Sequence, residues 1–271
     1  MATHFFEEKE HATLYQKYRP FASTEINDLI LKYLEKKKGK PFSLAVDVGC
    51  GSGQSSRGLA PFFDKVVGID VSEAQIEEAK KMRGLDNVSH RQGVAEKLDF
   101  KDASVDLVTA AAAAHWFDME KFMKEVDRVL KPKGCVALHC YQLPFAIHYN
   151  NCSEHLTQIM EEMFKTLVPY ESERRQIVRN KYKEIFEAIT FFDKERVDNI
   201  LIKQEVSISW AMGFIESLSY YQTFLKKDPE AAKSLLERTE QKLLKAMGVS
   251  SGDTVVEIRM NSFCLLASKP E

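Results

Sequence analysis

Short apolar runs alternate with amphipathic segments through the first half of the chain, and this alternation restricts the possible folds most. The run Leu44–Gly49 is almost continuously apolar and closes on glycine, which is typical of a strand buried on both faces. Four more strands are predicted at Lys65–Val71, Val88–Gly93, Val105–Ala110 and Cys135–Tyr141. Helices are predicted among them at Gln54–Phe62, Ser72–Met82 and Met119–Leu130. Such alternation predicts an α/β fold, a doubly wound and mostly parallel Rossmann-like sheet covered on both faces.

After Pro144 the pattern changes to long charged helices without a strand between them. These helices are predicted at Ser153–Val168 and Ser172–Thr190, and we interpret residues 144–200 as a helical insertion or cap after the fifth strand. A strand at Lys203–Trp210, a helix at Pro229–Met247 and a terminal strand at Thr254–Ser268 are expected to follow.

The whole chain, residues 1–271, is therefore expected to form one domain with four parts. Residues 1–39 would form an N-terminal lid segment with a helix at Thr24–Leu34, and residues 40–143 the ligand-binding core. The insertion comes next, and residues 201–271 would return to the sheet.

Composition excludes several classes of protein. Hydrophobic residues make up 44% of the 271 residues and charged residues 29%, which excludes a disordered chain. The net charge of −2 provides no basic field for nucleic acid. The longest apolar stretches are shorter than the ~20 residues of a membrane span, so we expect no membrane partner.

The N-terminus and the cysteines indicate the cytosol. No basic segment followed by an apolar one begins the sequence, so no secretory signal is expected. The five cysteines are odd in number and contain no Cys-x-x-Cys, which favours reduced thiols. Histidines and cysteines gather between Cys135 and His155, but their spacing fits no zinc pattern, and we predict no metal.

Three glycines follow the first predicted strand, at Gly49, Gly51 and Gly53, and a predicted helix begins directly after them. Glycine allows the backbone to turn tightly while a ligand lies against it. A dinucleotide fingerprint would need glycine where Gln54 stands, and it has no acid where Asp47 stands, which argues against a pyrophosphate ligand. Asp47 can instead orient the loop or receive the ammonium group of a cofactor with an amino-acid tail.

Two further positions fit a nucleoside. Asp70 ends the second strand about 20 residues after the glycines, where a carboxylate can accept both ribose hydroxyls. Ser72 already serves as the N-cap of the next helix, with Gln75 at the capping-box position. Beyond the third strand, Val94 to Glu96 could meet an adenine edge, although Glu96 could equally be a surface charge.

These segments resemble the successive motifs of class I S-adenosylmethionine-dependent methyltransferases. The matching segments are Asp47–Gly53, Gly68–Ser72, Ala95–Leu98 and Ser104–Thr109. Tyr15–Pro20 and Ala114–Asp118 resemble the small-molecule branch that includes trans-aconitate methyltransferases. The resemblance implies a seven-stranded sheet whose last strand is antiparallel.

The resemblance also implies roles for individual residues. It places Gly49, Gly51 and Gly53 beside the methionine part of S-adenosylmethionine and Ala111 near its amino acid. Cofactor contacts are further expected from Asp47, Asp70, Val71, Val94, Ala95, Glu96 and Tyr18. One departure is the alanine run Ala110–Ala114, where relatives are expected to carry glutamine.

The acceptor is expected to bind near His115, Trp116, Tyr15 and Tyr141. His115 could act as a general base or donate a hydrogen bond to the acceptor, whereas Trp116 could also simply pack beneath the next helix. Aromatic faces such as those of the tyrosines suit a sulfonium. The basic residues Arg174, Arg175, Arg179 and Lys181 could form a solvated helix face or reach an acidic substrate.

The sequence thus predicts transfer of a methyl group from S-adenosylmethionine to a small molecule, with a carboxylic acid as the favoured acceptor. A carboxylate is already ionised and needs no base, so proximity would supply most of the rate. A non-catalytic cofactor-binding or regulatory module and an NAD-dependent oxidoreductase are the alternatives. We expect a monomer or a homodimer, without nucleic-acid partners.

Overall fold

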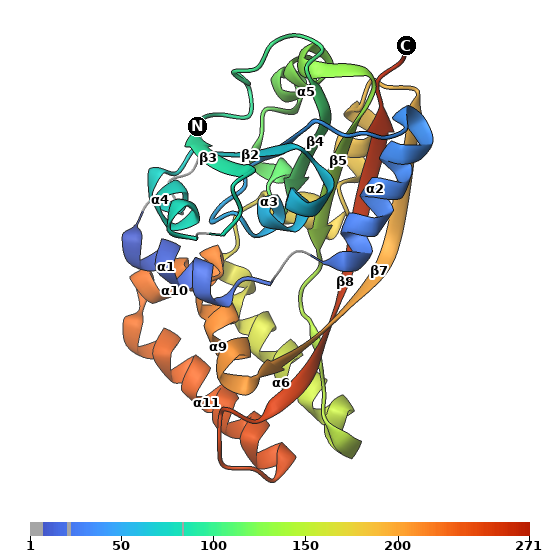
Figure 1. Ribbon diagram of the computed structural model, residues 1–271. Helices are drawn as coiled ribbons and strands as arrows, with labels where there is room; N and C mark the ends of the chain where they lie inside the picture. The colour runs from blue at the N-terminus through green and yellow to red at the C-terminus, as the bar shows by residue number, and fades with distance from the viewer. Residues whose placement is uncertain (1–7, 21–22, 83) are drawn as a thin grey trace.

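A twisted sheet runs through the centre of the computed structural model, which describes residues 8–20, 23–82 and 84–271 (Figure 1). Its parallel part consists, in order across the sheet, of β3 (Val88–Gln92), β2 (Lys65–Asp70), β1 (Leu44–Val48), β4 (Val105–Ala111) and β5 (Leu130–Tyr141). The central strands are buried along almost their whole length, as the continuous apolar runs predicted.

Antiparallel strands complete the sheet beyond β5. The last strand, β8 (Val255–Ser268), pairs with β5 through its second half and with the short β6 (Ala146–His148) through its first half. On its other side, β8 pairs along its length with β7 (Asp193–Ser207). Because β5 and β6 lie along the same edge of β8, the eight strands fill seven positions. The predicted seven-stranded sheet with an antiparallel last strand is therefore confirmed.

Helices cover both faces of the parallel sheet. Consecutive residues of β4, such as Leu107 and Val108, belong to two separate hydrophobic cores. One core includes α2 (Thr24–Lys38), and the other includes α5 (Met119–Val129). The helices α3 (Gln54–Leu59), with the 3-10 turn Ala60–Phe62, and α4 (Glu73–Lys81) connect the first three strands.

A second group of helices packs around the lower part of the β7–β8 ribbon (Figure 1). It consists of α6 (Ser153–Leu167), α9 (Ile208–Glu216), α10 (Ser219–Lys227) and α11 (Pro229–Met247). The N-terminal helix α1 (Lys9–Tyr18) lies between α4 and α9 and so joins the two halves.

Local signals fixed several helix ends as expected. The Ser72 hydroxyl accepts a hydrogen bond from the Gln75 backbone N–H at 3.2 Å and caps α4. Asp228 caps α11, Pro229 occupies its first turn, and the helix ends at Gly248 with φ of 68°.

Three predictions about the second half of the chain were wrong. The predicted helix Ser172–Thr190 is divided into α7 (Arg175–Arg179) and α8 (Lys183–Ala188), because Lys181 and Tyr182 take φ values of 51° and 57°. The insertion ends before residue 193, because residues 193–200 already belong to β7. The strand predicted at Lys203–Trp210 ends at Ser207. The Ser207 side chain accepts the Trp210 N–H and caps α9, which begins at Ile208.

Asp106 fastens β4 to the start of β1. Its side chain is fully buried and accepts hydrogen bonds from Ser43 N and Oγ and from Leu44 N, at 2.9, 2.7 and 2.9 Å. Lys38 and Lys131 lie 2.9 and 3.0 Å from its oxygens. Burial raises the pKa of Asp106, but these donors outweigh it and hold the pKa well below its usual value.

Replacing Asp106 with alanine is expected to lower the free energy of unfolding by about 3 kcal/mol, because buried donors and lysines lose their partner. Denaturant unfolding at pH 7 measures this loss, with the exposed Asp102→Ala as the matched control. Because the pKa of Asp106 is lower in the folded protein than in the unfolded chain, its contribution to the free energy of unfolding is complete above the unfolded pKa of about 4. This contribution decreases as the pH falls below that value. The gap between wild type and Asp106→Ala should therefore narrow in acid. A loss no larger than that of the control would contradict this role.

Candidate functional site

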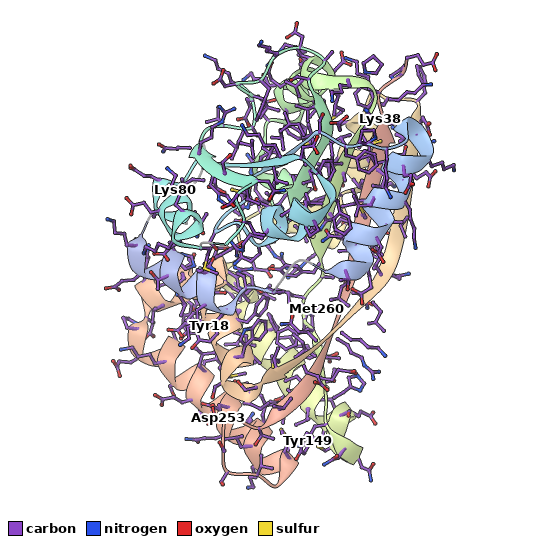
Figure 2. The ribbon with its side chains drawn as sticks, in the orientation of Figure 1. Tyr18, Lys38, Lys80, Tyr149, Asp253 and Met260 are labelled. Carbon is purple, nitrogen blue, oxygen red and sulfur yellow. The ribbon has the colours of Figure 1, made fainter. Side chains whose placement is uncertain are left out.

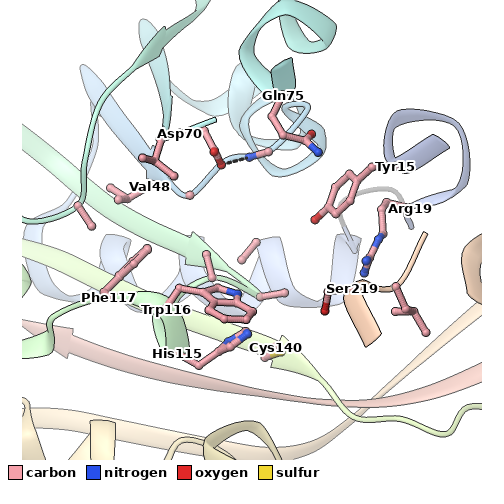
Figure 3. A pocket seen from close by; sticks show the side chains of 18 of the residues that line it. Tyr15, Arg19, Val48, Asp70, Gln75, His115, Trp116, Phe117, Cys140 and Ser219 are labelled. Carbon is pink, nitrogen blue, oxygen red and sulfur yellow. Dashed lines mark hydrogen bonds between the residues drawn. The ribbon is translucent and has the colours of Figure 1, made fainter. Parts of the chain in front are cut away.

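A cleft of about 1250 Å³, including its open mouth, lies beyond the carboxyl ends of the parallel strands. Open α/β sheets bind ligands at this edge. Loops after β1, β2, β3 and β4 form one half of its wall. The other half comes from α1, the end of β5, α7 and the start of α10 (Figure 3).

Asp70 is held at the end of β2 by two backbone groups. The Gly51 N–H donates to one of its oxygens (Figure 3), and the Ser72 N–H donates to the other, both at 2.8 Å. Burial raises the pKa of Asp70, and these hydrogen bonds counteract the shift. These two hydrogen bonds leave the carboxylate with acceptor capacity for a pair of hydroxyls.

The three glycines of the loop all have positive φ, at 69°, 53° and 85° for Gly49, Gly51 and Gly53. They differ in what they approach. A Cβ at Gly49 or Gly53 would lie 2.5 Å from Ala113 Cβ or from His90 Nε2, so those two glycines permit close packing within the protein. A Cβ at Gly51 would instead lie 3.3 Å from the Tyr15 ring, which lines the cleft. Gly49 and Gly51 line the cleft, whereas Gly53 lies behind it.

Asp47 lies beneath the glycine loop and does not line the cleft. Its side chain is fully buried, one oxygen accepts the Ser56 hydroxyl at 2.6 Å, and the other has no partner in the described chain. Burial raises the pKa of Asp47 to about 7. This position fits bracing of the loop rather than contact with a ligand.

Most of the other predicted cofactor residues do line the cleft. These are Val71, Val94, Ala95, Glu96 and Ala111. Glu96 is more than a surface charge, because it accepts the Asp118 backbone N–H at 2.8 Å. Tyr18 was placed wrongly. It lies at the end of α1 against Gly213 of α9, facing the helical half of the molecule (Figure 2).

His115 enters the cleft from the 3-10 turn Ala114–Trp116 after β4. Its side chain is buried, and its Nδ1 lies 2.7 Å from the Tyr182 hydroxyl. Burial, with the charges of Arg175 and Arg174, lowers the pKa of His115 to about 3. The imidazole is therefore neutral at pH 7 and a weak base. Trp116, Tyr15 and Tyr141, for which contact with the acceptor was also predicted, line the cleft as well.

The structure adds residues that sequence reasoning missed. Arg19 lies 4.3 Å from the Tyr15 ring, donates to the Tyr141 hydroxyl and donates to the Ser217 carbonyl at 3.0 Å. It belongs to the motif Tyr15–Pro20, which could have identified it. Tyr220, from a helix that was not predicted, also lines the cleft.

Gln75 is the other addition, on the cofactor side. Gln75 is 2% exposed, and neither its amide nitrogen nor its amide oxygen has a hydrogen-bond partner in the described chain. It lines the cleft near Asp70 (Figure 3). A buried amide usually pairs, so this amide is suited to a polar ligand. The sequence analysis considered this residue only as part of a helix cap.

S-adenosylmethionine fits these residues. The carboxylate of Asp70 suits a ribose diol, the groove by Val71 and Val94 suits an adenine, and Gly51 leaves room that a side chain would fill. The described residues contain no group of three or more histidine, cysteine or acidic side chains placed to hold a metal ion. No described helix is both long enough and apolar enough to span a membrane.

Comparison with known proteins agrees with this geometry. Residues 46–138 match the family described as methyltransferase domain. A protein of Dictyostelium discoideum named as a methyltransferase is 31% identical over 257 residues, covering 94% of this chain and 92% of that protein. The fold and cleft define the class I S-adenosylmethionine-dependent methyltransferases, which use this cofactor. The chain belongs to this family.

Solved structures show the same fold. A protein from Anaeromyxobacter dehalogenans described as a type II methyltransferase has a TM-score of 0.75 at 23% identity, covering 93% of this chain and 100% of that one. Phosphoethanolamine N-methyltransferase 2 of Haemonchus contortus, solved with S-adenosyl-L-methionine, has a TM-score of 0.52 at 19% identity. That likeness covers 97% of this chain and 58% of the other.

Proposed function

We propose that this methyltransferase methylates a small-molecule carboxylic acid. The carrying observation is the charge of the cleft. Arg19 and Arg175 line the side of the cleft that we assign to the acceptor. The acidic side chains among its described lining residues are Asp70 and Glu96, and both lie on the side that we assign to the cofactor. A buried cationic wall favours an anionic acceptor.

Arg175 has unused hydrogen-bonding capacity. Its side chain is 12% exposed, and its Nε has no hydrogen-bond partner within the described residues. Glu171 lies 3.8 Å away but is held more closely by Arg179, at 2.5 Å. The buried hydroxyl of Tyr220, whose ring centre lies 5.6 Å from the Arg175 guanidinium, also has no partner in the described chain. An anionic oxygen group would satisfy both side chains.

A carboxylate acceptor also agrees with the state of His115. When a carboxylate oxygen bonds to the methyl carbon, the carbon–sulfur bond breaks and its electron pair stays on sulfur. No proton is released, so no base is required. A hydroxyl or ammonium acceptor would have to lose a proton, for which a histidine with a pKa of about 3 is poorly suited.

The test uses purified protein, S-adenosylmethionine labelled in the methyl group, and the small-molecule and macromolecular fractions of a cell extract. Methyl esters release volatile labelled methanol in alkali, whereas N-, S- and C-methyl products do not. We expect alkali-labile product, and a rate roughly tenfold or more lower for Arg175→Gln with unchanged S-adenosylhomocysteine affinity. The exposed Lys183→Gln on α8 is the charge-matched control and should behave as wild type.

Three results would contradict the proposal. Alkali-stable product would exclude a carboxylate, and label confined to macromolecules would exclude a small acceptor. Cofactor binding without any transfer across the extracts would favour a non-catalytic module.

For the oligomeric state and the compartment, we propose a monomer or homodimer in the cytosol. The five free cysteines support a reducing compartment.

A further inference from the structure

The turn between α7 and α8 has an uncommon backbone. Lys181 and Tyr182 both have φ in the left-handed region, at 51° and 57°. A bulky residue rarely adopts this conformation unless its surroundings stabilise it. Tyr182 is nevertheless fully buried, so the turn directs a large side chain into the protein.

The contacts of Tyr182 show what this turn achieves. Its hydroxyl lies 2.7 Å from His115 Nδ1, and its ring packs edge-on against Phe263 at 5.0 Å. Arg174, from the same segment, donates to the His115 carbonyl at 3.0 Å. The segment 174–182 thus holds His115 by both its ring and its backbone, across about 60 residues of sequence.

The hydrogen bond between Tyr182 and His115 has a preferred direction. A neutral imidazole has one N–H and one lone pair, so the bond at Nδ1 decides which atom faces the cleft as a donor. Burial raises the pKa of Tyr182 well above its usual value, so the hydroxyl keeps its proton. A phenol is a stronger donor than a neutral imidazole N–H, and imidazole nitrogen is the stronger acceptor. These relative strengths favour donation from the phenol to Nδ1, with the imidazole proton on Nε2.

The surroundings of His115 agree with a neutral ring. The titratable and charged groups that interact with it or with Tyr182 are Arg174, Arg175 and Cys140. None of them is an acid that would favour a protonated imidazole. His115 Nε2 has no hydrogen-bond partner among the described residues, and the side chain lines the cleft.

We propose that Tyr182 is a positioning residue that holds His115 in the Nε2–H tautomer, so that His115 donates a hydrogen bond to the acceptor. The tautomer is independent of the acceptor's identity. The further step, that the hydrogen bond goes to a carboxylate oxygen, rests on the proposed function. Two readouts therefore separate the two claims.

The first readout is nuclear magnetic resonance of protein labelled with nitrogen-15 in its seven histidines. Two-bond proton–nitrogen correlations identify the tautomer, and the His115 signals are those lost in His115→Gln. We expect Nε2–H in wild type between about pH 5 and 8, and a mixture of tautomers in Tyr182→Phe. Tyr221→Phe, another buried tyrosine, which lies outside the cleft, is the matched control and should leave the tautomer unchanged.

An Nδ1–H signal for His115 in wild type would overturn the positioning role, and this result does not depend on the folding of Tyr182→Phe. An unchanged tautomer in folded Tyr182→Phe would also overturn it.

The second readout is kinetic, with an acceptor identified by the labelled transfer assay. Tyr182→Phe is expected to raise the KM for the acceptor about tenfold with a smaller change in kcat. In a His115→Ala background the same substitution should have no further effect, because Tyr182 acts through His115. Additive effects would show that Tyr182 serves packing alone, and so would overturn the proposal. Alkali-stable product together with an Nε2–H ring would instead refute the carboxylate while supporting the tautomer.

Discussion

Replacing Asp70 with alanine is expected to weaken S-adenosylhomocysteine binding at least tenfold, and by roughly a hundredfold if both ribose hydrogen bonds are lost. The substitution removes the acceptor for the ribose diol. It also releases the N–H groups of Gly51 and Ser72, which Asp70 holds at 2.8 Å, so the glycine loop loses an anchor. Isothermal titration calorimetry measures the dissociation constant.

Asp64 offers a matched control, because this exposed aspartate precedes the opposite end of the same strand. Asp64→Ala should bind as wild type does. If Asp70→Ala folds and its dissociation constant is unchanged, Asp70 has no part in cofactor binding.

Replacing Gly51 with valine is expected to abolish measurable cofactor binding. The position has φ of 53°, which a β-branched residue adopts only with strain, and the new side chain would enter the cleft beside the Tyr15 ring. The core strands should persist, because Gly51 lies in a loop at the edge of the sheet. Circular dichroism checks the fold, and calorimetry checks binding.

Gly248→Val separates backbone strain from obstruction of the cleft. Gly248 has a similar φ of 68° at the end of α11, with nothing within 4 Å of an added Cβ. Its substitution should destabilise the protein by about 1–2 kcal/mol and leave affinity intact. Normal binding by Gly51→Val would mean that the loop is only a turn.

The sequence predicted the cofactor half of the cleft because its signals are local. Gly51 and Asp70 each follow a strongly apolar run, and the carboxyl ends of neighbouring parallel strands must meet at one edge of the sheet. Position within a motif did not distinguish Gly51 from Gly53, or a cleft residue from Tyr18. Those differences depend on packing against distant elements, such as His90 behind Gly53 and Gly213 beside Tyr18.

The half of the cleft formed by α1, the end of β5, α7 and the start of α10 was much less predictable, because distant segments build it. Arg175 and Tyr220 come from helices that follow the core, and Arg19 comes from the segment that precedes it. The break between α7 and α8 depends on Tyr182 reaching His115, a contact that no local pattern reveals. The early start of β7 was also not predicted. Its first residues are mostly exposed or only partly buried, so apolar and polar residues alternate only weakly there.

Calorimetric titration of the wild-type protein with S-adenosylhomocysteine, and separately with NAD, tests the account most directly. We predict saturable binding of S-adenosylhomocysteine at one site per chain and no binding of NAD, because the loop lacks the glycine that a pyrophosphate needs at Gln54. Saturable binding of NAD with no binding of S-adenosylhomocysteine would contradict the assignment of the cleft.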